Sequence, residues 1–256
     1  MDSGLFFRLH DGLPRQAPGS DAATQDAVRR LKPHGLPDDP RVLDIGCGPG
    51  RSLMVLGRVT GGRVIGIDLH EPFLAEAQAR IDAAGLGRRL SVHKRSMLDL
   101  PAAGDGLFEP GSFDLLWAEG SICLAGFDEG LRRWRPLLRP GGLFGLTELT
   151  WLTAAPPAEA VAFWQNDYPA LRDEAANRAA AEAAGYRVLD RFALPPEAWW
   201  DEYYGPLGER IAAHRTAGAD DPAWAAVLDA AEAEITLYRR AGHSYGYVFY
   251  LLKRDG

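Results

Sequence analysis

A glycine-rich loop carries the clearest chemical signal in this sequence. The largely apolar run Val42–Ile45 is followed by glycines at alternate positions, Gly46, Gly48 and Gly50. Glycine lets the backbone turn sharply and lets a ligand touch it, and a helix that follows would direct its first N–H groups at that ligand. Asp68 stands 18 residues beyond Gly50, where a carboxylate can accept hydrogen bonds from both hydroxyls of a ribose. The loop and the carboxylate together predict a ligand that contains a nucleoside.

A dinucleotide cofactor is the main alternative for this loop. The fingerprint of such a site is G-x-G-x-x-G, whose third glycine packs the helix close to the pyrophosphate. That third glycine would fall on Arg51 if counted from Gly46, and on Leu53 if counted from Gly48. The carboxylate of Asp44 would also repel a pyrophosphate, whereas it suits a ligand that carries an ammonium group. A dinucleotide-dependent oxidoreductase therefore stays only as an alternative.

Alternating strands and helices must position this loop. Short apolar runs predict buried strands at 41–46, 64–68, 90–96, 113–120 and 143–149. Segments with helical periodicity or helix-capping residues lie before and between them, at 21–31, 51–59, 71–87 and 128–142. This alternation predicts an α/β fold, in which helices cover both faces of a parallel sheet. Ligands of such sheets bind outside the carboxyl ends of the strands.

The alternation changes after Thr150. Two more strands are predicted, at 187–194 and 244–254. The segments 151–175 and 195–241 are mostly helical in pattern and too long for simple connections. We interpret both as insertions that cover the carboxyl edge of the sheet.

The N-terminal segment 1–19 is rich in glycine and proline, and we expect it to be irregular. Arg15 and Gln16 lie in a part of it that is too polar for a core, so we expect it to fold over the ligand. We predict one domain over 1–256, with lid elements at about 1–20, 151–175 and 195–241.

Four motifs resemble the class I S-adenosylmethionine-dependent methyltransferases. The loop DIGCGPG is followed by GIDLH, FDLLWAEGSI resembles the family's fourth strand, and LLRPGGLFGLTEL resembles its fifth. Leu13–Ser20, Trp117–Ile122 and the aromatic-rich 151–204 are similar to an uncharacterised bacterial subgroup of small-molecule type. The resemblance implies a Rossmann-like, seven-stranded, mostly parallel sheet of order 3-2-1-4-5-7-6. Its last strand would be antiparallel, and helical lid insertions would cover one edge.

The same resemblance implies S-adenosylmethionine as cofactor and S-adenosylhomocysteine as product. The loop glycines would line methionine and ribose, Asp44 would lie near the ammonium group, and Asp68 would hold the ribose hydroxyls. Leu69 and Met97 would pack on the adenine. Ser96 takes the place of a common Asp that contacts the adenine amino group, and its neutral hydroxyl would bind more weakly. The predicted cofactor-binding residues are Gln16, Asp44, Gly46, Cys47, Gly48, Gly50, Asp68, Leu69, Ser96, Met97 and Glu119.

Methyl transfer from a sulfonium needs alignment and exclusion of water more than acid–base chemistry. Glu119 ends the fourth predicted strand, where it could contact the cofactor ammonium or accept a proton from the acceptor. We predict Glu119 as the catalytic residue, and Glu148 at the end of the fifth strand has a similar, weaker claim.

Aromatic residues are concentrated in the two insertions. Helical spacing would stack Trp199 on Tyr203 and Trp200 on Tyr204. Such rings could bury an apolar or aromatic acceptor beside the donated methyl group. The predicted substrate-binding residues are Trp164, Tyr168, Trp200 and Tyr204. The acceptor atom is not defined by the sequence, and a non-catalytic module that binds S-adenosylmethionine stays as a second alternative.

Composition argues against several other classes of protein. The net charge of −7 opposes binding to nucleic acid or to an anionic membrane. The sequence has neither a signal-peptide pattern nor the roughly 18 uninterrupted apolar residues of a membrane span. Cys47 and Cys123 show neither a disulfide framework nor metal-ligand spacing, so we expect no metal and a reducing cytoplasm. We expect a small-molecule substrate, and we leave a homodimer open.

Overall fold

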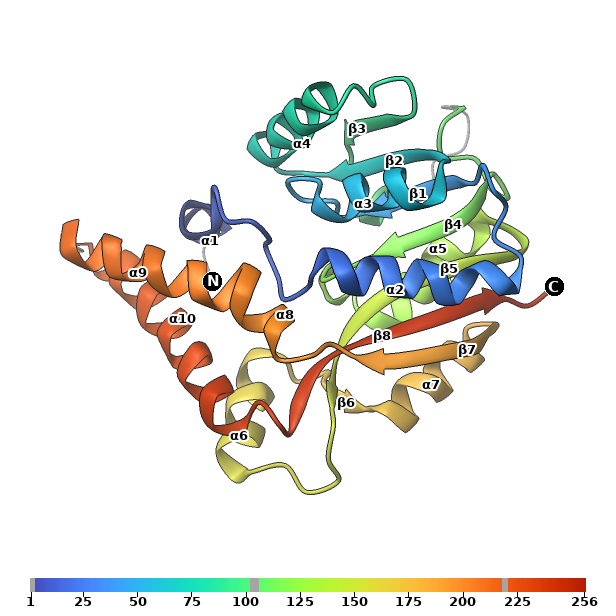
Figure 1. Cartoon of the computed structure of the whole chain (residues 1–256). Helices are drawn as coiled ribbons and strands as arrows, with labels where there is room; N and C mark the ends of the chain where they lie inside the picture. Colours follow the sequence, from blue (N-terminus) through green and yellow to red (C-terminus); the bar gives the residue numbers. More distant parts are fainter. Residues whose placement is uncertain (1–2, 102–105, 218–220) are drawn as a thin grey trace.

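An eight-stranded mixed sheet forms the centre of the molecule (Figure 1). The computed structural model describes residues 3–101, 106–217 and 221–256. The main path of the sheet has the order β3-β2-β1-β4-β5-β8-β7, and β6 pairs with β5 outside this path. The strands are β1 Arg41–Ile45, β2 Arg63–Asp68, β3 Leu90–Lys94, β4 Phe113–Ala118, β5 Leu138–Trp151, β6 Arg172–Asp173, β7 Tyr186–Ala193 and β8 Tyr245–Arg254.

This order confirms the predicted sheet. The strands β1 to β5 are parallel, and β8 runs antiparallel to both β5 and β7. β8 and β7 therefore correspond to the seventh and sixth strands of the predicted order 3-2-1-4-5-7-6, and the two-residue β6 is an addition. On β1, Leu43 lies opposite Ile65 of β2 and Leu116 of β4. This register brings the carboxyl ends of the parallel strands to one edge.

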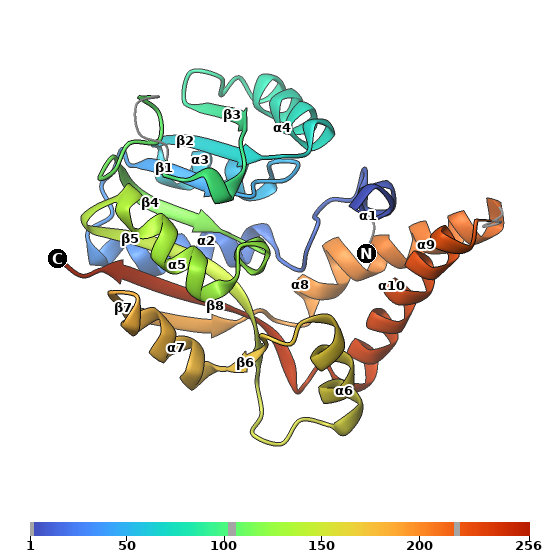
Figure 2. The ribbon, with the colours of Figure 1, turned by 180° about the vertical axis from the view of Figure 1, so that it is seen from behind.

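Helices cover both faces of the sheet (Figures 1 and 2). One face is covered by α2 Asp21–Leu31, α3 Arg51–Thr60 and α4 Glu71–Ala83. The opposite face is covered by α5 Phe127–Trp134 and α7 Glu174–Ala183. Short 3₁₀ turns lie at Lys32–His34, Met97–Asp99, Ile122–Leu124 and Arg135–Leu137. None of the described helices is both long and apolar enough to span a membrane.

The local sequence explains these elements. The Ser20 side chain caps α2 by accepting a hydrogen bond from the backbone N–H of Ala23 at 3.1 Å. In β1, Val42 packs into the core on one face of the sheet, whereas Leu43 and Ile45 pack into the core on the other. Because side chains alternate along a strand, such a run is apolar throughout only when both faces are covered.

A further set of helices stands beyond the carboxyl edge of the sheet (Figure 1). These outer helices are α1 Ser3–His10, α6 Ala158–Asp167, α8 Glu197–Trp199, α9 Gly205–Ala217 and α10 Pro222–Ala241. The π-helical turn η5, Trp200–Tyr204, joins α8 to α9. The outer helices arise from the three predicted lid segments, of which residues 1–2 and 218–220 lie outside the described residues. α10 contacts α1, α6 and α9, so the segments meet one another.

Two predicted elements are wrong in their extent. The N-terminal segment is not irregular throughout, because Ser3–His10 forms α1, with Leu9 buried and the Phe6 ring stacked on His10. The helix predicted over 128–142 ends at Trp134, and β5 already begins at Leu138. β5 has extra residues between its first two pairings with β4, so the Pro-Gly-Gly sequence forms a bulge inside the strand.

Candidate functional site

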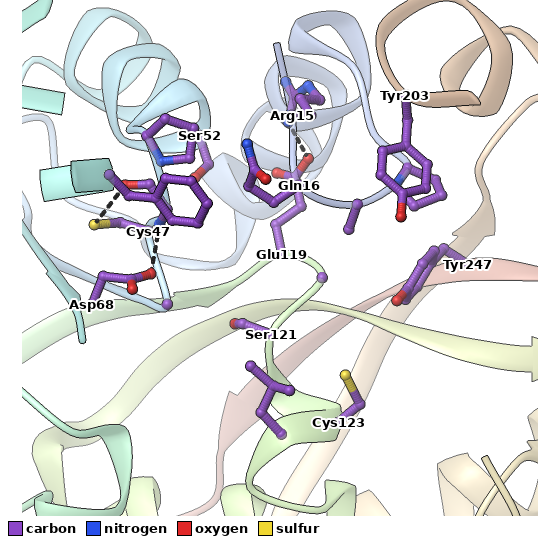
Figure 3. A pocket seen from close by; sticks show the side chains of 18 of the residues that line it. Arg15, Gln16, Cys47, Ser52, Asp68, Glu119, Ser121, Cys123, Tyr203 and Tyr247 are labelled. Atoms are coloured by element: carbon purple, nitrogen blue, oxygen red, sulfur yellow. Dashed lines mark hydrogen bonds and ion pairs between the residues drawn. The ribbon is translucent and has the colours of Figure 1, made fainter. Parts of the chain in front are cut away.

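A cavity of about 650 Å³ lies between the carboxyl edge of the sheet and the outer helices. In Figure 3, Asp68 and Cys47 lie on one side of this space, Tyr203 and Tyr247 on the other, and the Arg15–Glu119 pair between them. We call the two sides the loop end and the aromatic end. The loop end is lined by Gly46–Pro49, Asp68 and Leu69, and the aromatic end by Trp164, Tyr168, Trp199, Tyr203 and Tyr247.

The glycine loop approaches the cavity as predicted. Gly46 and Gly48 line the cavity and have φ angles of 75° and 50°, in the left-handed region that favours glycine. A Cβ on Gly46 would lie 2.5 Å from the Ser121 Cβ, so Gly46 allows the loop to pack against the segment after β4. A Cβ on Gly48 would meet nothing closer than the Gln16 side chain at 3.6 Å. The main chain at Gly48 therefore faces the cavity with no side chain in between.

Gly50 was predicted to contact the ligand, but it does not line the cavity. A Cβ at this position would lie 2.9 Å from the Cβ of Ala77 on α4. Gly50 has a φ of 86° and caps the start of α3. The physical reason for glycine here is thus the close packing of α3 against α4.

Asp44 lies behind the loop rather than in the cavity wall, and it is buried. Its Oδ2 accepts a hydrogen bond from the Ser52 hydroxyl at 2.7 Å, whereas Oδ1 has no hydrogen-bond partner among the described residues. Burial raises the pKa of Asp44 to about 7, although the Ser52 hydrogen bond acts in the opposite direction. A buried carboxyl group with one unsatisfied oxygen suits a cationic group placed nearby.

Asp68 ties the loop to the end of β2. Its Oδ2 accepts a hydrogen bond from the Gly48 N–H, and its Oδ1 accepts one from the His70 N–H, both at 2.9 Å. A carboxylate has about four acceptor positions, so each oxygen can still accept a hydrogen bond from the cavity side. Asp68 lines the cavity at the position predicted for a ribose-binding carboxylate.

Two of the three residues predicted to contact adenine line the cavity. These are Leu69, which is 58% exposed, and Met97. Ser96 does not line the cavity, because its hydroxyl accepts a hydrogen bond from the Leu98 N–H and caps a 3₁₀ turn. Its neighbour Arg95 lines the cavity instead. The sequence motif that contains Ser96 did not indicate this local capping role.

The N-terminal segment adds aromatic residues that sequence analysis missed. Phe6 and Phe7 of α1 line the cavity. The Phe7 ring stacks on His70 with centroids 3.8 Å apart and meets Phe73 edge-on. The paired aromatics beside His10 could have indicated a helix with a packed face. Gln16, which was predicted to bind the cofactor, lines the cavity, and its Oε1 has no partner among the described residues.

Glu119 lines the cavity as predicted, but its acceptor positions are largely filled. Oε1 accepts a hydrogen bond from Arg15 at 2.9 Å. Oε2 accepts hydrogen bonds from the Thr24 hydroxyl at 2.8 Å and from the Trp117 indole at 3.1 Å. A buried ion pair stabilises the charged carboxylate, so this geometry suits a positioning role better than proton acceptance.

Arg15 joins three parts of the chain at the cavity wall. Besides Glu119, it pairs with Asp21 at the start of α2, at 2.9 Å, and with Glu202 of η5, at 2.7 Å. Gly19 allows this arrangement, because a Cβ there would lie 2.7 Å from Glu119 Oε1. The Gly19 N–H also donates to the Ala198 carbonyl of α8 at 2.9 Å. The N-terminal segment is therefore anchored over the middle of the cavity.

Two of the four predicted substrate-binding residues line the aromatic end, and two do not. Trp164 and Tyr168 line the cavity, whereas Trp200 and Tyr204 lie outside its wall. The reason is packing against α10, where the Tyr204 hydroxyl donates a hydrogen bond to Glu234 and the Arg239 guanidinium lies over the Trp200 ring. The Trp199 and Tyr204 ring centroids are 5.5 Å apart. Trp199 and Tyr203, together with Tyr247 of β8, form the wall instead.

Carboxyl and thiol groups accompany these rings. Tyr168 donates a hydrogen bond to Glu148 Oε1 at 2.7 Å, and Glu148 is buried behind it. Burial raises the pKa of Glu148 to about 7, against the effect of that hydrogen bond. Glu234 of α10 lines the cavity, and Tyr204 donates to its Oε1 at 2.7 Å. Burial raises the pKa of the Cys123 thiol to about 12, so the thiol stays protonated at neutral pH.

The central part of the chain matches a known protein family. Residues 42–142, which contain the glycine loop, Asp68 and Glu119, match the family model described as a methyltransferase domain. The sheet has the order and the antiparallel strand that the class I resemblance implies. Residues 42–142 are thus a methyltransferase domain of class I.

Known proteins with similar sequences match part of this chain. An uncharacterized protein of Haemophilus influenzae is 30% identical over 143 residues, which are 55% of this chain and 53% of that protein. Methyltransferase GfsG of Streptomyces halstedii is 34% identical over 110 residues, 43% of this chain and 37% of that protein. The chain thus spans about half, or less, of the curated relatives it matches.

A solved structure extends the similarity to the whole fold. A methyltransferase from Thiobacillus denitrificans, in complex with S-adenosylhomocysteine, superposes with a TM-score of 0.78. The two sequences are 20% identical, and the alignment covers 97% of each chain. The outer helices of this chain are therefore part of a fold that another protein shares.

Proposed function

We propose that this methyltransferase transfers a methyl group from S-adenosylmethionine to a small acceptor with an apolar or aromatic part. The observation that carries the proposal is the single cavity with two chemically different ends. The loop end offers bare backbone and carboxylates, and the aromatic end offers rings. The residues of the loop end would hold the cofactor, and those of the aromatic end would hold the acceptor.

The loop end fits the cofactor on several independent grounds. Gly48 leaves backbone open to a ligand, and Asp68 retains acceptor positions for ribose hydroxyls. The buried Oε1 of Gln16 has no partner among the described residues and could accept a hydrogen bond from the ammonium group of the methionine moiety. The unsatisfied Oδ1 of Asp44 lies behind the loop, where a nearby cation would stabilise its charge. Leu69 and Met97 offer apolar surface for the adenine. When bound, the cofactor supplies an electrophilic methyl group on a sulfonium.

The protein contributes to such a transfer mainly by aligning the reactants and excluding water. In-line displacement needs the acceptor atom, the methyl carbon and the leaving sulfur aligned, which the rigid sheet edge and the aromatic wall would impose. The outer helices, as a lid, would keep water away from the sulfonium. The Arg15–Glu119 pair would hold the N-terminal segment over this point. No residue of the loop end has to accept a proton for the C–S bond to break.

Calorimetry tests the donor assignment. We expect the protein to bind S-adenosylmethionine and S-adenosylhomocysteine, and not NAD or NADP. Asp68→Ala should weaken S-adenosylhomocysteine binding by about 1.5–3 kcal/mol, as for hydrogen bonds to a charged acceptor. Asp229→Ala, at an exposed ion pair on α10, is the matched control and should bind like the parent. Tight NAD binding without binding of either adenosyl ligand would overturn the proposal.

Turnover tests the acceptor part. Release of S-adenosylhomocysteine should be measured with a panel of small alcohols, phenols, amines, thiols and carboxylic acids. We expect release with at least one small acceptor that has an apolar or aromatic part. A protein that binds the donor and methylates none of them would instead be the non-catalytic binding module.

A further inference from the structure

The aromatic end of the cavity contains carboxyl groups that lack basic partners. Glu234 lines the wall near Tyr203 and Tyr247, and Asp167 at the end of α6 lines the same cavity. In the part of the chain that the structure describes, neither residue forms a salt bridge, although Glu234 accepts the Tyr204 hydrogen bond. Burial and the charge of Asp167 raise the pKa of Glu234 to about 7.

The arginine side chains that line the cavity interact with groups other than Glu234. Arg15 pairs with Glu119, Glu202 and Asp21. Arg51, at the start of α3, pairs with the same Glu202 and Asp21. Arg95 follows β3, and its guanidinium lies over the Phe108 ring, 4.8 Å from the ring centroid. The positive charge is thus concentrated away from Glu234, and the aromatic end carries net negative charge.

Ring faces and a buried acceptor complete this environment. The aromatic end is lined by two indoles and three phenols, and the Trp199 ring stacks on Tyr247 with centroids 5.5 Å apart. Glu148, behind Tyr168, is 2% exposed, and its Oε2 has no hydrogen-bond partner among the described residues. An aromatic face attracts a cation through its quadrupole, and the attraction grows when water is excluded. An anionic or strongly electron-rich acceptor would meet repulsion from the same groups.

We propose that the aromatic end recognises an acceptor that carries an ammonium group, seated between Glu234 and the rings of Trp199, Tyr203 and Tyr247. This inference rests on the proposed function, because it assigns the aromatic end to the acceptor. It refines the predicted apolar or aromatic acceptor: the carbon skeleton packs on the rings, and the charge is matched by Glu234. An ammonium group also supplies N–H or C–H donors to the carboxylate oxygen that Tyr204 does not hold.

A set of ligands with one skeleton and three charges tests the inference. Calorimetry with protein saturated in S-adenosylhomocysteine would compare 2-phenylethylamine, 2-phenylethanol and phenylacetate, with tetramethylammonium as a smaller cation. We expect at least one cation to bind about tenfold more tightly than the alcohol, with phenylacetate weakest. The inference is overturned if the alcohol or the acid binds as tightly as the cations, or if neither cation binds.

A matched pair of variants assigns the effect to Glu234. Glu234→Gln keeps an oxygen for the Tyr204 hydrogen bond and removes only the charge, so cation affinity should fall at least fivefold while alcohol affinity stays within twofold. Glu232→Gln, on the exposed side of the same helix, should change neither. An unchanged ratio of cation to alcohol affinity in Glu234→Gln would contradict the assignment.

The two proposals fail in different ways. If the parent protein does not bind S-adenosylhomocysteine, the proposed function fails, and the same ligand set measured without it still decides whether the aromatic end prefers cations. If S-adenosylhomocysteine binds and acceptors are methylated without any preference for a cation, only the inference about Glu234 fails.

Discussion

At the scale of single residues, each of the three loop glycines is needed for a different physical reason. Gly46 makes room for the Ser121 side chain, Gly50 makes room for Ala77, and only Gly48 leaves space toward the cavity. All three have positive φ angles, so any side chain costs about 1 kcal/mol in backbone strain before contacts are considered. Alternate glycines in a sequence therefore do not all report ligand contact.

This difference predicts opposite effects of two alanine substitutions. Gly48→Ala should weaken S-adenosylhomocysteine binding at least tenfold, because the new methyl group would occupy ligand space, and should cost only the strain of about 1 kcal/mol in stability. Gly50→Ala should cost about 2–4 kcal/mol in stability, because strain is joined by overpacking against Ala77. Denaturant unfolding and calorimetry would measure both. The loop assignment is wrong if Gly48→Ala binds the ligand like the parent.

The aromatic wall gives a second prediction at this scale. Tyr203→Phe removes a hydroxyl from the cavity wall and its contact with His10 Nε2 at 3.3 Å. We expect the acceptor KM to rise about three- to tenfold, the value of one hydrogen bond, with the KM for S-adenosylmethionine unchanged. Trp200→Phe is the control, because Trp200 lies outside the wall, and its kinetics should match the parent. Equal effects of the two variants would contradict the wall described here.

At the scale of elements, the N-terminal segment is held by charge rather than by apolar packing alone. Arg15 is 6% exposed and meets three carboxylates, one directly after β4, one in α2 and one in η5. Arg15→Ala would leave Glu119 buried without its cation, which typically costs about 3–5 kcal/mol. We expect lower stability in denaturant and faster proteolysis between residues 3 and 20. Arg29→Ala removes an exposed ion pair instead and should cost less than about 1 kcal/mol. Similar losses in both variants would show that the Arg15 network does not anchor the segment.

The elements also show what could and could not be predicted from sequence. Strands such as Val42–Ile45 were recognisable because burial on both faces leaves an uninterrupted apolar pattern. The loop carboxylate Asp68 was recognisable because its distance from the glycines is set by one helix and one strand. The orientation of the π-helical turn at Trp200 was not recognisable from the sequence, because it depends on how the outer helices pack and not on local periodicity. The sequence pattern pairs Trp199 with Tyr203 and Trp200 with Tyr204, but it does not indicate which of the two pairs lines the cavity.

At the scale of the whole molecule, buried carboxyl groups link stability to pH. The pKa values of Asp44, Glu148 and Glu234 are each raised by burial to about 7, against roughly 4 in an unfolded chain. The folded state therefore binds more protons than the unfolded state between these values, and stability falls as the pH rises through 7. Burial lowers the pKa values of His10, His93 and His214, which has the opposite effect, but that effect ends near pH 6.5, the unfolded value.

The interval from pH 6.5 to 8 thus isolates the carboxyl groups. We expect the midpoint of thermal unfolding of the ligand-free protein to fall across this interval, with each group contributing at most about 1.4 kcal/mol per pH unit. Asp44→Asn and Glu148→Gln should each flatten the slope, because the amide carries no charge at any of these pH values, whereas Glu182→Gln on the surface of α7 should not. A midpoint that is constant or rises from pH 6.5 to 8 would mean that these carboxyl groups are ionised throughout in the folded protein. Since Asp44 lies at the loop end and Glu234 at the aromatic end, a cationic ligand at either end should reduce the same slope by stabilising the charged carboxylate.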